Sequence, residues 1–195
     1  LTNSELGQIT AGSLTVGNGS SGAIIVEGVS SSSFGSLILN SASTMTFSTT
    51  ASSFSSLTLD AGSAVDFGVN VTATGNLSVT SGGAITDTGI LTVGGTSSFT
   101  TDVAGQAITL DNTSNSFTGT VSLNTSGSGS ATLNSNNAVT LLTSTVGGNL
   151  NVTVGGNNSL NVTGAGTAGG SITLLADDDI IFTASGDLTT TTGNI

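Results

Sequence analysis

The chain contains no Lys, Arg, His, Cys, Pro, Trp or Tyr. Nucleic acids bind through Lys and Arg side chains that displace counterions from phosphates, so we expect no nucleic-acid partner. An anionic membrane surface is disfavoured for the same reason, and no apolar run reaches the ~20 residues needed to cross a bilayer, so we expect no membrane insertion. Without cysteine the chain forms neither disulfides nor thiolate metal sites.

The same absences argue against catalysis. No His, Cys or Lys is present as a general base or covalent nucleophile, and Ser lacks a partner that would activate it. Two carboxylates about 5–9 Å apart would suffice for glycoside hydrolysis, and the candidate pairs are Asp60 with Asp66 and Asp87 with Asp102. Sugar-binding clefts are usually lined with the large aromatic and basic residues that this chain lacks. We therefore expect no enzyme, and a polysaccharide-degrading β-helix enzyme stays an alternative.

What the chain does contain is Gly, Ser, Thr and Asn, with 35% apolar residues and only acidic charges, which give a net charge of −11 over 195 residues. Such a composition is common in disordered chains, but those have low hydrophobicity and few β-branched residues. Here Val, Ile and Thr are abundant, and the apolar residues are regularly spaced. The sequence therefore predicts a folded protein.

One short unit recurs along the chain: an apolar residue, a small polar residue and a second apolar residue. Alternation with a period of two is typical of a strand with one buried face, and each unit is flanked by turn-forming Gly, Ser, Asn or Asp. The units include Leu14-Thr15-Val16, Leu37-Ile38-Leu39, Met45-Thr46-Phe47, Leu57-Thr58-Leu59, Val65-Asp66-Phe67, Leu77-Ser78-Val79, Leu91-Thr92-Val93, Ile108-Thr109-Leu110, Val121-Ser122-Leu123, Val139-Thr140-Leu141, Leu150-Asn151-Val152, Leu160-Asn161-Val162 and Ile172-Thr173-Leu174.

The units recur at a fixed interval of about 20 residues, which predicts an all-β solenoid with one coil per repeat and about ten coils in all. Helix is disfavoured by propensity, and a β-sandwich is the alternative fold. The columns that share this interval are Leu37/Leu57/Leu77, Leu39/Leu59/Val79, Met45/Val65/Ile85, Phe34/Phe54 and Phe47/Phe67. The predicted core comprises Leu37, Leu39, Met45, Phe47, Leu57, Leu59, Val65, Phe67, Leu77 and Val79.

We expect residues 1–195 to form a single β-solenoid segment. The interval is lost at about 89–120, which predicts less regular coils or an inserted loop there. It returns at Val139, Leu160 and Ile180, which lie 21 and 20 residues apart. Stacked coils also explain the missing basic residues, because a column of Lys would repel itself at every ~4.8 Å step, whereas Ser, Thr and Asn can hydrogen-bond along the column.

Two stretches carry a family resemblance: residues 75–89, with Gly75-Asn76-Leu77, and residues 170–188, with Ile172-Thr173-Leu174. Both resemble the repeats of large bacterial exoproteins of the filamentous-haemagglutinin type. The resemblance implies a right-handed parallel β-helix that acts as the structural stalk of a surface adhesin or extracellular filament. It also implies two-partner secretion or autotransport, an extracellular or cell-surface location, and a host or neighbouring cell as partner.

The chain opens without a signal peptide and stops within a repeat, so we expect an internal segment of a longer secreted chain. No capping element is expected at either end, since the terminal residues follow the repeat. Exposed strand edges then predict either continuation of the parent chain or end-to-end self-association.

The densest charge is Asp177, Asp178 and Asp179, between predicted strands at 172–175 and 180–183. Calcium takes six to eight oxygen ligands, and these carboxylates with turn carbonyls are the candidate calcium site. Because alternate residues face opposite sides, at most two of the three would share one ion; the competing interpretation is a solvated turn. We expect no other cofactor.

A ligand-binding solenoid for glycan, calcium or ice is the other alternative function. Ice-binding solenoids present flat Thr-x-Thr arrays, and four pairs have that spacing here: Thr44/Thr46, Thr72/Thr74, Thr86/Thr88 and Thr118/Thr120. These pairs do not recur at the coil interval, which favours solvated Thr columns.

Overall fold

The alternating units form short strands whose apolar side chains point inward and whose polar residue points outward. In β4 (Met45–Phe47), for example, Met45 and Phe47 are fully buried while Thr46 between them is not. The computed structural model describes residues 3–30 and 34–195 and shows an all-β solenoid of about nine turns, with roughly 20 residues per turn. The predicted fold class is confirmed; the predicted number of ten coils is about one too many.

The strands of the described residues form three sheets, and every strand pair is parallel. Sheet A contains β1 (Ala11–Gly17), β3 (Phe34–Ser41), β6 (Leu57–Ala61), β9 (Leu77–Ser81), β12 (Ser97–Thr101), β15 (Thr120–Thr125), β17 (Val139–Leu141), β18 (Ser144–Val146), β20 (Leu160–Val162), β21 (Gly166–Ala168), β23 (Ile180–Phe182) and β24 (Leu188–Thr190). Sheet B contains β2 (Ile24–Val26), β4 (Met45–Phe47), β7 (Val65–Phe67), β10 (Ile85–Asp87), β13 (Ile108–Leu110), β16 (Ala131–Ser135), β19 (Leu150–Val154) and β22 (Ile172–Ala176). Sheet C contains β5 (Ser52–Phe54), β8 (Val71–Ala73), β11 (Leu91–Val93) and β14 (Ser116–Phe117).

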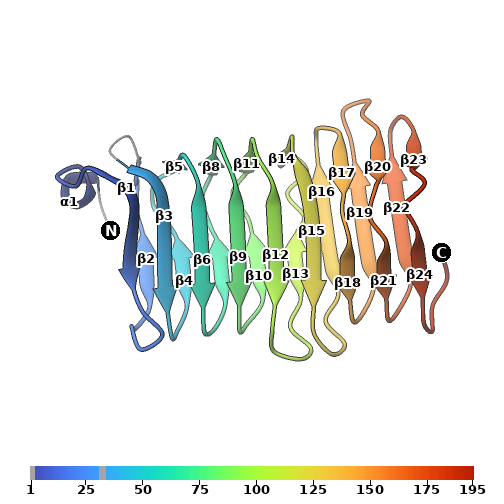
Figure 1. The fold of residues 1–195 in the computed structure, drawn as a ribbon, viewed down its shortest axis with the longest axis horizontal. Helices are drawn as coiled ribbons and strands as arrows, with labels where there is room; N and C mark the ends of the chain where they lie inside the picture. Colours follow the sequence, from blue (N-terminus) through green and yellow to red (C-terminus); the bar gives the residue numbers. More distant parts are fainter. Residues whose placement is uncertain (1–2, 31–33) are drawn as a thin grey trace.

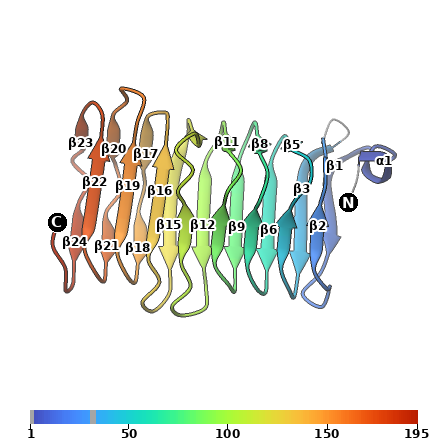
Figure 2. The same cartoon turned by 180° about the vertical axis from the view of Figure 1, so that it is seen from behind.

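The chain visits the sheets in rotation, so each coil adds one level to the stack. The strands lie side by side along one long axis, with the two ends of the chain at opposite ends of the rod (Figures 1 and 2). At ~4.8 Å per level, nine levels give a rod about 40 Å long.

The ladder register confirms most of the predicted columns. Leu37 pairs with Leu57 and Leu57 with Leu77, and the neighbouring column runs from Leu39 through Leu59 to Val79. The ten predicted core residues are all buried, none more than 1% exposed. In sheet B, Phe47 stacks on Phe67 with ring centroids 5.1 Å apart. Similar apolar side chains therefore lie one above another in these columns, as the coil interval predicts.

The predicted Phe34/Phe54 column is wrong. Phe34 is the first residue of β3 and pairs with Ala11 in sheet A, whereas Phe54 ends β5 and pairs with Ala73 in sheet C. The reason is that β3 runs through eight residues, while the chain bends at residues 55–56 before the equivalent strand β6 begins. Equal spacing in sequence thus brings two residues to different sheets.

Longer coils lie within the stretch 89–120 for which the sequence predicts irregularity. Ser97 pairs with Val121 and Ile85 with Ile108, in place of partners 20 residues away. The added residues form the turns that follow β12 and β13. Beyond them, the register from Val139 through Leu160 to Ile180 follows the predicted spacing.

The cross-section of the rod changes at β15. The start of β15 pairs with β17 and its end with β18. The single row of sheet A strands that begins at β1 therefore continues beyond β15 as two rows of short strands. The fully buried Ser144 stabilises this bend: its Oγ accepts the Leu123 N–H at 3.1 Å and donates to the Leu142 carbonyl at 3.0 Å. Sheet C ends one strand earlier, at β14.

A helical turn, α1 (Asn3–Leu6), lies beyond β1 at the N-terminal end of the rod (Figure 1). Leu6 is buried and belongs to the core cluster. The expectation of no capping element is therefore wrong at this end, because α1 covers part of the core there. None of the helices in the described residues has the length and apolarity to cross a membrane.

Some corners depend on glycine because successive coils approach closely. A Cβ at Gly147 would lie 1.8 Å from the Gly127 carbonyl oxygen, and one at Gly169 would lie 1.9 Å from the Gly147 oxygen. These distances are far below van der Waals contact with backbone that cannot move aside. Three stacked glycines therefore maintain the ~4.8 Å step at this corner.

Replacing Leu57 by Asp tests the buried column. Leu57 lies between Leu37 and Leu77, so the variant loses apolar contacts in adjacent coils and buries an unpaired carboxylate. We expect a loss of ~4 kcal/mol or more in the free energy of unfolding, measured by chemical denaturation followed by circular dichroism. The outward Thr58→Asp is the matched control and should change it by less than ~1 kcal/mol; equal effects of the two substitutions would refute the inward orientation of Leu57.

Candidate functional site

Outward side chains form columns along the rod and hydrogen-bond between coils. Thr86 Oγ1 donates to Asp66 Oδ1 at 3.0 Å, and Ser36 Oγ donates to Ser13 Oγ at 3.0 Å. Each pair consists of partners in adjacent strands of one sheet. The polar surface therefore contributes contacts parallel to the ladder itself.

At the corners, Ser and Asn side chains accept backbone N–H groups of the next coil. Ser56 Oγ accepts the Asn76 N–H at 3.2 Å, and Asn76 Oδ1 in turn accepts the Thr96 N–H at 2.9 Å. A second chain of contacts runs from Ser130 through Asn149 to Ser171. These side chains supply acceptors to backbone donors at the bends, so their first role is structural.

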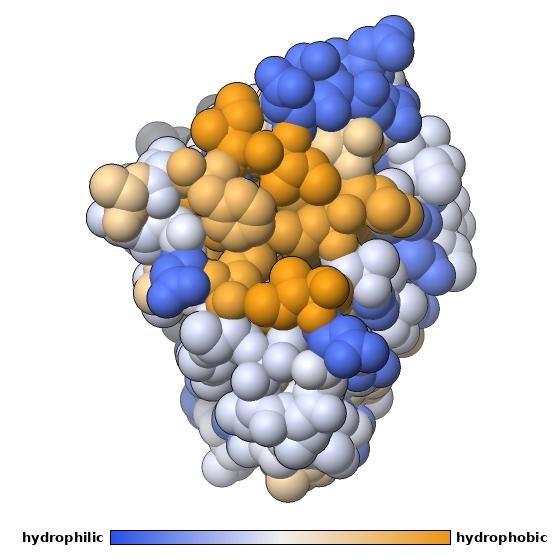
Figure 3. Space-filling view, turned by 90° about the vertical axis from the view of Figure 1, so that its right-hand side faces the viewer, coloured by the Kyte–Doolittle hydropathy of each residue, from blue (hydrophilic) through white to orange (hydrophobic). Residues whose placement is uncertain are grey.

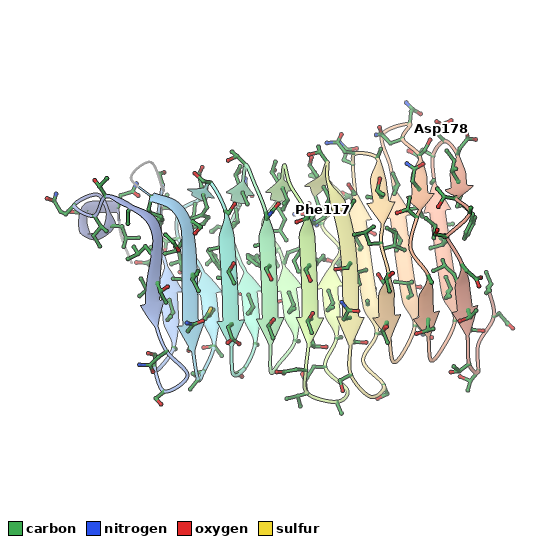
Figure 4. All side chains as sticks on the ribbon, in the orientation of Figure 1. Phe117 and Asp178 are labelled. Carbon is green, nitrogen blue, oxygen red and sulfur yellow. The ribbon has the colours of Figure 1, made fainter. Side chains whose placement is uncertain are left out.

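The three candidate calcium ligands follow β22 in an exposed turn at the C-terminal end, and Figure 4 shows Asp178 at the outer rim of that end. Asp177 Oδ2 lies 3.5 Å from the Asn157 N–H nitrogen, and Asp178 Oδ2 accepts the Ser159 hydroxyl at 2.8 Å. The first two carboxylates thus contact the preceding coil. Within residues 3–30 and 34–195, no three His, Cys, Asp or Glu side chains gather as a metal-binding group. Calcium binding here stays a prediction.

The candidate carboxylate pairs for glycoside hydrolysis occupy unlike environments. Asp60 lies on sheet A and Asp66 on sheet B. Asp87 is buried, whereas Asp102 is exposed in the turn after β12. The geometry adds no support for a paired-carboxylate mechanism.

The Thr-x-Thr pairs are distributed over different sheets. Thr46 and Thr86 lie on sheet B, Thr72 on sheet C and Thr120 on sheet A. A flat array needs neighbouring pairs on one face, so the structure adds no support for ice binding through these pairs.

The buried pair Asp87 and Asn115 was not identified as a unit from the sequence. Asn115 Nδ2 donates to Asp87 Oδ2 at 2.6 Å, and Asn115 Oδ1 accepts the Leu91 N–H at 2.7 Å. Burial raises the pKa of the Asp87 carboxyl above its ordinary value, against the opposing effect of the hydrogen bond from Asn115. A signal was present in the sequence, because Asp87 follows Phe47 and Phe67 at the coil interval and is therefore expected to point inward.

Near this pair, the apolar core is continuous. Phe117, labelled in Figure 4, ends β14 and is fully buried, with its ring 6.1 Å from that of Phe99 in an edge-to-face contact. The buried polar pair thus lies in a coil whose other inward residues are mostly apolar, and this environment is the cause of its desolvation.

Comparison with known families shows a likeness over part of the chain. A family model described as repeats of unknown function (DUF5649) matches residues 54–124. Over these residues, from the end of β5 to β15, the chain is similar to that family, which supports its repeat character. No curated protein and no solved structure matches the chain.

Asn76→Ala tests the corner contacts. The variant removes the acceptor for the Thr96 N–H, and we expect a loss of ~1 kcal/mol in the free energy of unfolding, measured by urea denaturation. Asn76→Ser is the control, because Ser occupies the equivalent position one coil earlier and accepts the Asn76 N–H. A stability of Asn76→Ala equal to that of both wild type and Asn76→Ser would show that this contact contributes nothing.

Proposed function

We propose that the chain is a structural stalk: a rod segment of a secreted bacterial surface adhesin or extracellular filament, without an active site. The observation that carries this proposal is the parallel ladder that runs from β1 to β24 along one axis. Each coil contacts chiefly its two neighbours, so rod length grows by addition of coils and needs no separate core.

The use of the polar side chains supports a structural role. Ser, Thr, Asn and Asp on the surface contact the next coil, as in the Thr86–Asp66 and Asn76–Thr96 pairs. A net charge of −11 with no basic residue keeps rods apart in solution and disfavours lateral association. Neither feature requires a bound ligand.

The extracellular location rests on the resemblance to filamentous-haemagglutinin-type repeats and on composition. A chain without Lys or Arg has no cleavage site for trypsin-like proteases, which suits exposure outside the cell. Secretion by a two-partner or autotransporter route belongs to the same proposal.

The C-terminal end of the rod supports association along its axis. Viewed end-on, an apolar area is surrounded by polar residues (Figure 3). Leu175, Ile180, Ile181 and Phe182 each expose more than a third of their surface, although they lie on β22 and β23. A parallel edge with exposed apolar side chains is the surface on which a further coil packs.

The two ends of the rod differ, which bears on what covers this edge. A second copy stacked head to tail would bring the seven-residue β1 against the three-residue strands β23 and β24. It would also bring the three-residue β2 against the five-residue β22. The rod itself pairs strands of such unequal lengths, β15 with β17 and β18 and β13 with β16, so strand length does not decide between the two arrangements. The helical turn α1, however, covers part of the core at the N-terminal end, where a second copy would have to stack. We therefore propose that further coils of a longer polypeptide continue the stack at the C-terminal end, in preference to end-to-end association of identical segments.

Electron microscopy of the native material tests this function. We expect long, thin fibres whose power spectrum contains a layer line near ~4.8 Å, the spacing of stacked coils. Immunogold labelling with an antibody against this segment should mark the shaft of the fibre. Compact particles without that spacing, or labelling confined to a receptor-bound tip, would contradict the stalk and favour a binding module.

A further inference from the structure

The turn that follows β1 contains Asn18-Gly19, the one Asn-Gly pair in the chain. Gly17, the last residue of β1, has a φ of 80°, so the chain changes direction directly after the strand. The Ser21 N–H then closes the turn on the backbone carbonyl of Asn18 at 2.9 Å. Asn18 and Gly19 are both exposed, so water reaches the side-chain amide and the peptide N–H that follows it.

The Asn18 side chain is held against the backbone of this turn. Its Oδ1 accepts the Ser20 N–H at 2.8 Å, and the Ser21 hydroxyl, which also accepts the Asn18 N–H at 2.9 Å, lies 3.5 Å from the same oxygen. The ring that the Oδ1 bond closes includes the Gly19 nitrogen. That nitrogen is therefore kept close to Cγ, the carbonyl carbon of the Asn18 side chain.

This arrangement favours attack of the Gly19 nitrogen on Cγ. As that bond forms, negative charge develops on Asn18 Oδ1, which already accepts the Ser20 N–H. Donors directed at an oxygen that gains charge lower the barrier to such an addition. Neither the Gly19 N–H nor Asn18 Nδ2 has a hydrogen-bond partner within residues 3–30 and 34–195, so no contact retains the proton or the leaving amine.

We propose that Asn18 is a site of self-modification, which converts to isoaspartate and aspartate in the folded rod through a cyclic imide. Solvent hydroxide takes the Gly19 N–H proton, the nitrogen bonds to Asn18 Cγ, and the bond from Cγ to Nδ2 breaks. Nδ2 takes up a proton and leaves as ammonia. Water then opens the imide ring: attack at Cγ gives aspartate, and attack at the main-chain carbonyl carbon gives isoaspartate. The net change is one water consumed and one ammonia released.

A second turn in the rod has the same hydrogen bonds without the reactive pair. Asn112 Oδ1 accepts the Ser114 N–H at 3.0 Å, and the Asn115 N–H closes that turn on the Asn112 backbone carbonyl at 3.1 Å. The residue between them is Thr113, whose β-branched side chain restricts the approach of its nitrogen. Asn112 Nδ2 also donates to the Thr88 carbonyl at 2.9 Å, which retains the leaving group. Asn112 is therefore an internal control for Asn18.

The modification would act on the contact between the first two coils. Isoaspartate inserts a methylene group into the main chain of the turn, on which the corner of the second coil depends. The Ala42 N–H donates to the Ser21 carbonyl at 2.8 Å, and Ser41 Oγ donates to the Gly22 carbonyl at 2.7 Å. Both products also add a negative charge to a chain that has no basic residue. The first coil should therefore loosen with time, whatever the rod carries.

Storage of the folded protein in mildly alkaline buffer, followed by peptide mass spectrometry, tests the site. Glu5 and Glu27 are the only glutamates, so a glutamate-specific protease releases residues 6–27 with Asn18 inside. We expect the amide nitrogen of Asn18 to be replaced by oxygen, with isoaspartate and aspartate both present and distinguished by electron-transfer fragmentation. A synthetic peptide of residues 6–27 serves as the clock for the reaction.

The outcomes are distinct. Asn112, followed in the 111–176 fragment from an aspartate-directed protease, should remain an amide. An intact Asn18 amide in the folded protein, after the synthetic peptide has largely converted, would overturn the proposal. Aspartate without isoaspartate would also overturn it, because direct hydrolysis of the side chain gives aspartate alone. Conversion of Asn112 at the rate of Asn18 would show that the Asn-Gly pair has no special reactivity.

Two glycine variants separate the reaction from the fold. Gly19→Ala should slow the conversion of Asn18 by ~tenfold or more, because a Cβ restricts the approach of the nitrogen to Cγ. The substitution fits, since the φ of Gly19 is not left-handed and an added Cβ meets no atom within 4 Å. Gly12→Ala, at an equally open position in β1, should leave the rate unchanged. Equal rates in the two variants would refute cyclisation through the Gly19 nitrogen.

Amide hydrogen exchange measures the consequence. In the stored wild type, protection of the Ala42 N–H should fall relative to fresh protein, because this group donates to the modified turn. Protection of the Leu150 N–H, which donates to the Ser171 carbonyl in a distant coil, should not change. Stored Gly19→Ala should retain the protection of fresh protein at both groups. Unchanged protection of Ala42 in fully converted wild type would refute the loosening of the first coil.

Discussion

Stacking of parallel coils in register, at ~4.8 Å per level, is the constraint on which the rest of the structure depends. Each residue has as its nearest long-range neighbour the residue one coil away, as Leu57 has Leu37 and Leu77. A side chain is therefore favoured where it packs against a similar one above and below, as Leu57 does. This requirement explains the apolar columns inside, the hydroxyl and amide columns outside, and the glycines at corners such as Gly147.

The same constraint connects composition to the proposed role. Polar side chains that accept N–H groups of the next coil, such as Asn76 and Asn149, are part of the backbone hydrogen-bond network and are not free to bind a ligand without a cost in stability. A chain that uses its surface in this way is suited to length and cohesion more than to recognition.

The sequence predicts the fold well where the interval is constant, because a column of like residues identifies both the strand and its inward face. It fails where the path of the chain changes without a change in spacing, as for Phe34 and Phe54, which belong to different sheets. The division of sheet A at β15 depends on the buried Ser144, a residue that composition does not distinguish from the many surface serines. Of the candidate sites, the turn at Asp177 lies where the sequence predicts it. The burial of Asp87 is predicted only if the coil interval, which identifies the inward apolar positions, is also applied to charged residues.

Distances between spin labels along one outward column test the stacking most directly. Thr15, Ile38, Thr58, Ser78, Ser98 and Ser122 are successive ladder partners, and the cysteine-free chain accepts labels at chosen pairs of cysteine substitutions. Thr15→Cys combined with Ser98→Cys spans four levels, or ~19 Å, and with Ser122→Cys five levels, or ~24 Å. Electron paramagnetic resonance should show the second pair longer than the first by about one ~4.8 Å step. Equal distances, or an increase of several steps, would contradict in-register stacking of the coils.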